Sequence, residues 1–307
     1  MSSRGRVGLL VNPTAGRGDG RAAGTRVLQT LRCLGHDVTD LSGPDLAQVS
    51  RTARERTGEF EALVVVGGDG LVHAGVEAVA GTGTPLGIVP AGTGNDIARG
   101  LDLALGNPVA AAESVARALH AGSHRRVDAV RVEHAGGAGW FASILSSGVD
   151  ALINDRANAW RWPRGPARYT LAALRELVVV RAVPVRLTLD GVAHDLDSLL
   201  VAVANTRCYG GGILMAPEAD PADGLLDVVV VDRLSPVAAL QLFPRARRGR
   251  HVGLPEVRVH RARRVVLEPL GDGGREGRRP RPHADGEPLG GTPVTCEVVP
   301  GALTVLA

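Results

Sequence analysis

Three glycine-rich segments of this sequence have the residue types from which phosphate-binding turns are built. They span residues 12–16, 67–70 and 92–96. Glycine allows a phosphate to approach the backbone closely, and it accepts the φ > 0 geometry that is costly for other residues. Each turn taken alone also fits an ordinary strand-ending or helix-capping turn. Their occurrence together is what indicates a phosphate site.

Acidic residues near these turns are candidates for chemistry. Asp69 stands between glycines directly after an apolar segment, where an acid packs poorly and is better placed to act on a ligand. Asp285 and Glu287 form a second acidic pair. Because they are two residues apart, an extended backbone would point both side chains the same way. On its own this pair would equally fit an exposed acidic loop.

The turns follow short apolar segments at residues 7–11, 63–66 and 85–89, and helical stretches come after them. Continuous apolar strands that alternate with helices predict a parallel sheet covered on both faces, which is a doubly wound α/β domain. Ligands bind such a sheet at the carboxyl ends of the strands, near helix N-termini. We therefore expect the three turns to lie side by side at one edge.

After about residue 127 the pattern changes to short β-rich segments with many turn signals. Strands without intervening helices favour an antiparallel sandwich or barrel, and one helix is expected near residues 167–179. The domain boundary is predicted near residues 122–128. Residues 271–283, rich in Gly, Arg and Pro, predict a mobile loop. The expected strands are 130–133, 185–189, 199–204, 226–231, 257–259 and 265–268.

Composition excludes several enzyme classes. All 35 basic residues are arginine, and the chain has no lysine. P-loop enzymes, protein kinases and pyridoxal enzymes each need a lysine, so all three are excluded. A hydride-transfer enzyme is disfavoured, because the first turn lacks the Gly-x-Gly-x-x-Gly form and Asp40 does not clearly end the second strand.

The sequence predicts a cytoplasmic protein. No apolar run approaches the ~20 residues of a membrane-spanning helix, and the best candidate, residues 171–180, is interrupted by Arg175 and Glu176. The N-terminus has no secretory signal pattern. The cysteines lack disulfide or metal-ligand spacing, which favours a reducing compartment. They are Cys33, Cys208 and Cys296.

As a set, the segments 12–16, 67–70 and 90–96 resemble the diacylglycerol kinase catalytic domain family. That family includes bacterial soluble diacylglycerol kinases and the related sphingosine and ceramide kinases. The resemblance continues in the second half, so it covers nearly the whole chain. The further matching segments are 210–212, 216–227, 249–251, 255–257 and Asp285-Gly286-Glu287.

The resemblance implies transfer of the γ-phosphoryl group of MgATP to a lipid hydroxyl, and the acceptor that it favours is diacylglycerol, with phosphatidic acid as the product. It implies an ATP-binding α/β domain over residues 1–125, to which a segment at about 297–307 returns. Residues 126–296 would form an antiparallel β-sandwich that binds the acceptor. The fold is thus expected to be like that of NAD kinases and diacylglycerol kinases.

The resemblance also implies roles for individual residues. Glu287 would accept the proton of the acceptor hydroxyl, while Asp285 and Asp69 orient the hydroxyl and a catalytic Mg²⁺. A structural Mg²⁺ would bind the Asp223 carboxylate and backbone oxygens of Asp220 and Leu225; hard oxygen ligands suit this ion, although Asp223-Gly224 alone also fits a hairpin turn. The ATP-binding residues would be Asn12, Pro13, Thr14, Ala15, Gly16, Ser42, Gly67, Gly68, Gly70, Gly92, Thr93 and Asn95.

One departure from the family stands beside the second turn. The family usually follows its Gly-Gly-Asp-Gly with Thr and a polar or acidic residue, whereas Leu71-Val72-His73 follows here, so a hydroxyl near the phosphates is lost. Two alternatives stay open. One is NAD-kinase-like phosphorylation of a soluble dinucleotide; the other, suggested by Leu71 and His73, is a non-catalytic nucleotide-binding regulatory protein.

A basic region spans residues 245–264, with eight arginines and one acid, Glu256. Each basic residue near an anionic membrane surface adds ~1 kcal/mol to adhesion. The region therefore predicts peripheral contact with a lipid surface, which an enzyme with an apolar substrate needs. Nucleic acid is not expected, because the few aromatic residues provide no stacking platform. The oligomeric state is left open, a homodimer included.

Overall fold

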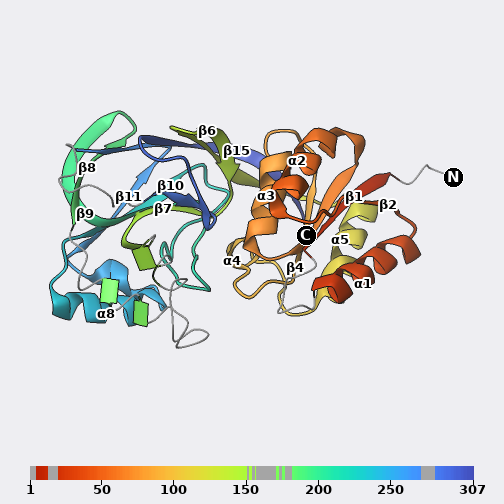
Figure 1. Ribbon diagram of the computed structural model, residues 1–307, viewed down its shortest axis with the longest axis horizontal. Coiled ribbons are helices and arrows are strands. Elements are labelled where there is room, and N and C mark those ends of the chain that lie inside the picture. Colours follow the sequence, from red (N-terminus) through yellow and green to blue (C-terminus); the bar gives the residue numbers. More distant parts are fainter. Residues whose placement is uncertain are drawn as a thin grey trace.

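The computed structural model describes residues 5–12, 20–150, 152–153, 156, 171–172, 175–176, 182–270 and 281–307. Its elements gather into two lobes (Figure 1). One lobe consists of helices around the first strands, and the other consists mainly of strands from the second half of the chain. The helix expected near residues 167–179 and the loop expected at 271–283 lie largely outside the described residues.

The first lobe is built on a parallel sheet with the strand order β4-β3-β1-β2. Strands β1, β3 and β4 are apolar and buried in the middle, as expected when both faces are covered, whereas β2 at the edge is mostly polar. The strands are β1 (Arg6–Val11), β2 (Asp37–Asp40), β3 (Ala62–Gly67) and β4 (Leu86–Pro90).

Helices cover both faces of this sheet. One core includes Leu9 and Val64 from the strands with residues of α1 and α5, and the other includes Leu10 and Val65 with residues of α2 and α3. This is the doubly wound α/β arrangement that the sequence predicted. The helices of the lobe are α1 (Gly20–Cys33), α2 (Leu46–Arg56), η2 (Thr57–Glu59), α3 (Asp69–Val79), α4 (Asp96–Gly100) and α5 (Pro108–Ala121).

The second lobe is a β-sandwich of antiparallel strands, and it includes a helix and a short 3₁₀ turn, α8 (Pro236–Ala246) and η3 (Arg250–Gly253). Aliphatic side chains from facing strands fill its core. The strands are β5 (Arg125–His134), β6 (Gly137–Phe141), β7 (Ile144–Gly148), β8 (Val183–Leu189), β9 (Val192–Ala204), β10 (Leu226–Asp232), β11 (Val257–Ala262), β12 (Arg264–Pro269), β13 (His283–Ala284), β14 (Glu287–Pro288) and β15 (Val294–Leu306).

Strand β15 connects the two lobes. Its first part pairs antiparallel with β12 and β5, and at its end Val305 and Leu306 pair parallel with β4. The C-terminal end of the chain therefore lies within the first lobe (Figure 1). The division into domains at residues 125 and 126, with 297–307 as the returning segment, stays a prediction.

Candidate active site

The second and third glycine-rich turns touch each other. They follow the neighbouring strands β3 and β4, and the amide of Ala91 donates to the Gly67 carbonyl at 2.9 Å. A Cβ atom added to Gly92 would lie 2.4 Å from the Cα atom of Gly68. Only glycine allows backbones to come this close. The expected side-by-side placement of these turns is therefore what the structure contains.

The described part of the first turn reaches the same edge. The amide of Asn12 donates to the Val66 carbonyl at 3.1 Å, and the Ser42 hydroxyl accepts from the amide of Val11 at 2.9 Å. The side chain of Asn12 lies against Gly67. The rest of the predicted first turn lies outside the described residues, namely Pro13, Thr14, Ala15 and Gly16.

Asn95 shapes the third turn. Its φ of 53° is left-handed, a region that Asn tolerates better than most residues. Its side chain accepts from the amide of Gly92 at 2.8 Å and donates to the Gly92 carbonyl at 3.0 Å. The turn is thus closed by the side chain of Asn95, which makes no capping bond to α4. Thr93 is exposed at its tip.

Asp69 begins helix α3 and faces the third turn. Its Oδ1 atom accepts from the amide of Ile97 at 3.0 Å. A Cβ atom added to Gly94 would lie 2.9 Å from Oδ2. Burial raises the pKa of this carboxyl, and the charges of Asp96 and Asp285 raise it further, while the amide of Ile97 opposes them. The carboxylate therefore stands close to both turns and to other acids.

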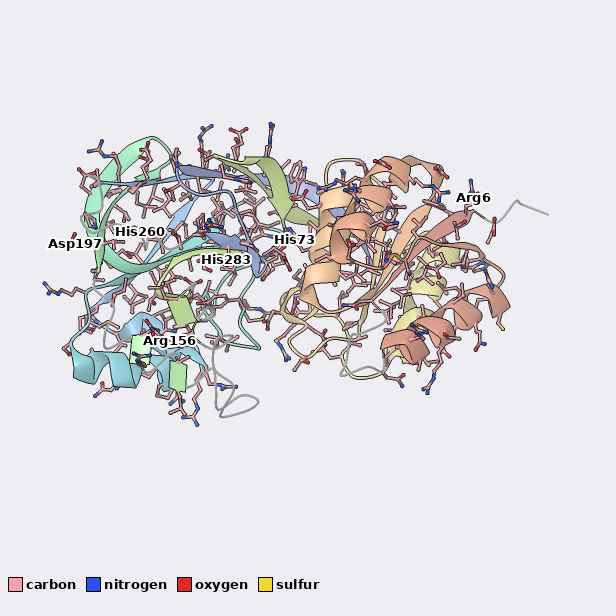
Figure 2. All side chains as sticks on the ribbon, viewed as in Figure 1. Arg6, His73, Arg156, Asp197, His260 and His283 are labelled. Carbon is pink, nitrogen blue, oxygen red and sulfur yellow. The ribbon has the colours of Figure 1, made fainter. Side chains whose placement is uncertain are left out.

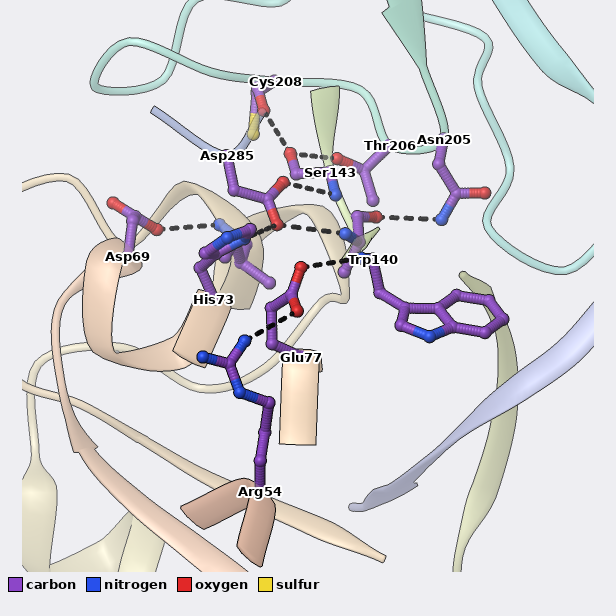
Figure 3. A network of polar contacts seen from close by, with 12 residues as sticks. Arg54, Asp69, His73, Glu77, Trp140, Ser143, Asn205, Thr206, Cys208 and Asp285 are labelled. Carbon is purple, nitrogen blue, oxygen red and sulfur yellow. Dashed lines mark hydrogen bonds and ion pairs between the residues drawn. The ribbon is translucent and has the colours of Figure 1, made fainter. Parts of the chain in front are cut away.

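Asp285 is held by three donors from two lobes (Figure 3). Oδ2 accepts from the amide of Ala142 at 3.0 Å and lies 3.1 Å from Nδ1 of His73, and Oδ1 accepts from the amide of Ser143 at 2.8 Å. The side chain is 0% exposed. A carboxylate with three such partners is an anchor, because its acceptor capacity is directed at protein groups.

The backbone of the acidic pair differs from the expected extended segment. Asp285 and Gly286 have φ of 52° and 89°, so they form a tight turn between the two-residue strands β13 and β14. The extended-backbone prediction is wrong for this reason. Glu287 nevertheless reaches α3: its Oε1 would lie 2.7 Å from a Cβ atom added to Gly70. Asp69, Asp285 and Glu287 are therefore neighbours.

Two functional candidates were not among the predicted site residues. His73 contacts Asp285 across 212 residues of sequence, and Figure 2 shows it at the boundary between the lobes. Asp96 is buried and accepts from the amides of Gly211 and Gly212 at 2.6 and 2.7 Å. The sequence signals for them were positional: Asp96 is the last residue of the third glycine-rich segment, and His73 stands three residues after the second.

Two residues of the segment that departs from the family pattern, Leu71 and His73, have different surroundings. Leu71 is 4% exposed and packs in the core between the sheet and α3, behind Gly67. His73 is mostly buried among acids. Burial alone lowers the pKa of its imidazole, but the hydrogen bond to Asp285 and the charges of Asp285, Glu77 and Glu287 outweigh it and raise the pKa.

The predicted structural metal site lies in the loop before β10. Asp223 accepts from the amide of Leu225 at 2.9 Å, and its other oxygen is paired with Arg261. Asp220 accepts from the amide of Ala222. Among the described residues, no group of three or more acidic, His or Cys side chains could hold a metal ion, so a cation here would depend on one carboxylate and backbone oxygens.

The comparisons with known proteins cover both lobes. Residues 6–132 match the diacylglycerol kinase catalytic domain, and residues 143–307 match the YegS C-terminal NAD kinase beta sandwich-like domain. A diacylglycerol kinase from Mycobacterium tuberculosis is 39% identical over 305 residues, which cover 98% of this chain and 95% of that protein.

More distant relatives agree with this match. A diacylglycerol kinase from Bacillus subtilis is 25% identical over 266 residues, which cover 85% of each chain. A crystal structure of a diacylglycerol kinase from Bacillus anthracis aligns with a TM-score of 0.71 at 22% identity, over 100% of this chain and 98% of that one. That likeness concerns the fold.

Proposed function

Because this chain belongs to the diacylglycerol kinase family, we propose that it transfers the γ-phosphoryl group of MgATP to a lipid hydroxyl. Diacylglycerol is the best candidate acceptor, and phosphatidic acid would be the product. The hydroxyl oxygen forms a bond to the γ-phosphorus, the bond to the leaving oxygen of ADP breaks, and the hydroxyl proton goes to a base of the protein.

One observation carries this proposal: a carboxylate from the second lobe stands over the phosphate-binding turn of the first. Glu287 lies against Gly70 at the beginning of α3. Helix N-termini attract phosphates, so an acceptor hydroxyl between this helix end and Glu287 would have both a phosphoryl donor and a base within reach. We assign the proton-accepting role to Glu287, because the Asp285 carboxylate is engaged with three protein donors.

In a chain without lysine, arginine is the side chain that can bring a fixed positive charge to the triphosphate. Arg99 is exposed on α4, and its Nη2 lies 3.5 Å from the carbonyl of Gly94 in the third turn. Within the described part of the chain, no carboxylate comes within 4.0 Å of its guanidinium nitrogens. Phosphoryl transfer is accelerated mainly by positioning and charge stabilisation. We infer that Arg99 contacts the phosphates of the donor.

The loop with Asp223 fits a bound Mg²⁺ in its chemistry. Among the residues that the structure describes, Arg261 is the cation paired with both Asp223 and Asp227. Oδ2 of Asp227 is buried and makes no hydrogen bond in the described structure, and burial raises the pKa of this carboxyl. A hard cation held by Asp223 and the carbonyl oxygens of Asp220 and Leu225 would balance the negative charge of the Asp223 and Asp227 carboxylates. Its contribution would be structural.

Contact with the lipid surface is proposed to be peripheral. No helix in the described ranges is long and apolar enough to cross a membrane. Three arginines of the basic region, Arg258, Arg261 and Arg264, are paired with acids. The exposed arginines that follow α8 are better candidates for anionic lipid. They are Arg247, Arg248 and Arg250.

The proposal is tested by incubating the purified protein with MgATP and vesicles that contain diacylglycerol, a sphingoid base or phosphatidylglycerol. We expect phosphorylation of one lipid, and losses of kcat of about 10²–10⁴-fold in Asp69→Asn and Glu287→Gln proteins, since general-base catalysis contributes this much. If none of these lipids is phosphorylated, the proposal is wrong. Formation of NADP from NAD would identify a dinucleotide kinase, and ATP binding without turnover a regulatory protein.

A further inference from the structure

The second lobe contributes the acidic turn of the site, while the glycine turns belong to the first lobe. Asp285 and Glu287 belong to the hairpin of β13 and β14, which pairs with β7 and thus with the second lobe. The phosphate-binding turn and Gly70 belong to the first lobe. For Glu287 to act on a hydroxyl held beside Gly70, something must hold the hairpin against α3.

His73 makes the side-chain contact that does so. It lies one helical turn after Asp69 on α3, and its Nδ1 lies 3.1 Å from Oδ2 of Asp285. An ionised carboxylate only accepts hydrogen bonds, so Nδ1 must carry the proton. The other two donors to Asp285 are the amides of Ala142 and Ser143, which belong to the second lobe. His73 is therefore the one donor to this carboxylate that comes from α3.

We propose that His73 is a positioning residue, which fixes the Asp285-Gly286-Glu287 turn on helix α3 so that Glu287 stays beside Gly70. The inference rests on the proposed function in one respect, because it takes Glu287 as the proton acceptor. The side chain of His73 is 14% exposed and that of Asp285 is 0% exposed. A hydrogen bond so well shielded from water holds its geometry better than an exposed one.

The choice of substitution follows from the ring geometry. The Asn amide nitrogen occupies nearly the place of the imidazole Nδ1, whereas the Gln amide nitrogen occupies nearly the place of Nε2. His73→Asn therefore keeps a donor for Asp285, and His73→Gln moves it away. Both variants are polar, and Asn is the smaller of the two and fills less of the space of the imidazole. A loss in His73→Gln that is absent in His73→Asn therefore reports the contact and not the loss of packing. His120→Asn, at an exposed position on α5, is the control.

The kinetic test compares these proteins with the best lipid acceptor. We expect kcat to fall at least about tenfold in His73→Gln, because a misplacement of ~1 Å can cost about 10²-fold. The KM for ATP should change little, since the glycine turns are untouched. His73→Asn should restore most of kcat, and His120→Asn should match the wild type. An equal loss in the Asn and Gln variants would overturn the proposal.

A second readout needs no activity. Hydrogen–deuterium exchange is followed in peptides that cover residues 139–147 and 283–290, which hold the amides bonded to Asp285 and the turn itself. Faster exchange is expected in His73→Gln and near wild-type exchange in His73→Asn. Unchanged exchange in His73→Gln would also overturn the proposal. If the wild type phosphorylates no lipid, the proposed function fails, while this comparison still decides the role of His73.

Discussion

At the scale of single residues, the acids of the site fall into two groups: those whose carboxylates already accept several protein hydrogen bonds, and those with few such partners. Asp285 accepts from two amides and lies against an imidazole, and Asp96 accepts from two amides. Asp69 accepts from the amide of Ile97 through one oxygen. Glu287 stands over Gly70 at the helix end. Acids that bind several backbone amides fix the shape of the site. Asp69 and Glu287 are therefore the better candidates for contact with substrate.

The glycine at position 92 gives a prediction at this scale. A Cβ atom there would lie 2.4 Å from the Cα atom of Gly68, and backbone cannot move aside as a flexible side chain can. Gly92→Ala should force the turns apart, destabilise the protein by about 1–3 kcal/mol as overpacking does, and weaken ATP binding at least about tenfold through lost positioning. Urea unfolding and calorimetric titration with ATP measure the two effects.

Gly58→Ala is the matched control, because nothing lies within 4 Å of a Cβ atom at that position. It should leave ATP affinity at the wild-type value. Wild-type affinity in Gly92→Ala as well would mean that the contact between the turns has no part in nucleotide binding.

At the scale of elements, strands with a continuous apolar sequence were predicted well, whereas the two-residue strands β13 and β14 were not predicted. Strand β3 is buried throughout, so its sequence is a continuous apolar run. Strands β13 and β14 have two residues each, too few for any periodicity, and they form only because they extend the pairing of β7. Strand β9 begins seven residues before the predicted 199, since its first half is mostly exposed and mixes polar with apolar residues. Helix α3 begins at Asp69 because Gly68 provides an extended N-cap.

His251 connects η3 to the loop that follows the glycines at 210–212, and its surroundings predict how stability depends on pH. Its Nε2 lies 3.0 Å from the Met215 carbonyl, so Nε2 carries the proton, and its buried Nδ1 makes no hydrogen bond in the described structure. Burial lowers the pKa of this imidazole, while the bond to Met215 opposes it. The folded protein thus binds a proton here less readily than the unfolded chain.

The direction of the pH dependence of stability follows from the linkage between proton binding and folding. Stability from the neutral His251 is present above the unfolded pKa of about 6.5 and is lost as the pH falls below it. Against His251→Gln, which cannot titrate, the wild type should lose its advantage in free energy of unfolding between pH 7.5 and about 5. Urea unfolding at several pH values measures this. The difference between the two proteins cancels His73, whose raised pKa has the opposite effect. A pH-independent difference would contradict the prediction.

At the scale of the whole molecule, polar contacts connect the two lobes around the site. Oε1 of Glu77 on α3 accepts from the amide of Trp140 at 2.7 Å, and its other oxygen pairs with Arg54 at 3.3 Å. The carboxylate of Asp96 on α4 accepts from Gly211 and Gly212. Together with β15 and His73, these contacts set how the acidic turn faces the glycine turns.

Asp96→Asn tests this connection. An amide offers one oxygen for two donors, so one of the Gly211 and Gly212 amides loses its acceptor. We expect a loss of about 1–3 kcal/mol in the free energy of unfolding, with faster hydrogen exchange at residues 209–213. Asp102→Asn is the control: Asp102 pairs with Arg207 at the surface, and its loss should stay within ~0.5 kcal/mol. Equal losses in both variants would contradict a bridging role for Asp96.

The sequence by itself determined the parallel α/β lobe, the β-rich second half and the family, because these follow from local patterns: apolar runs of buried strands, glycines at strand ends and short motifs in fixed order. It placed Asp69, Asp285 and Glu287 in one site only through resemblance. Tertiary structure alone decided that Asp285 anchors the turn, that Glu287 stands over Gly70 and that His73 joins the lobes. These contacts depend on strand register and on two left-handed residues at 285 and 286, which bring together side chains more than two hundred residues apart in the chain, and no local pattern encodes such a distance.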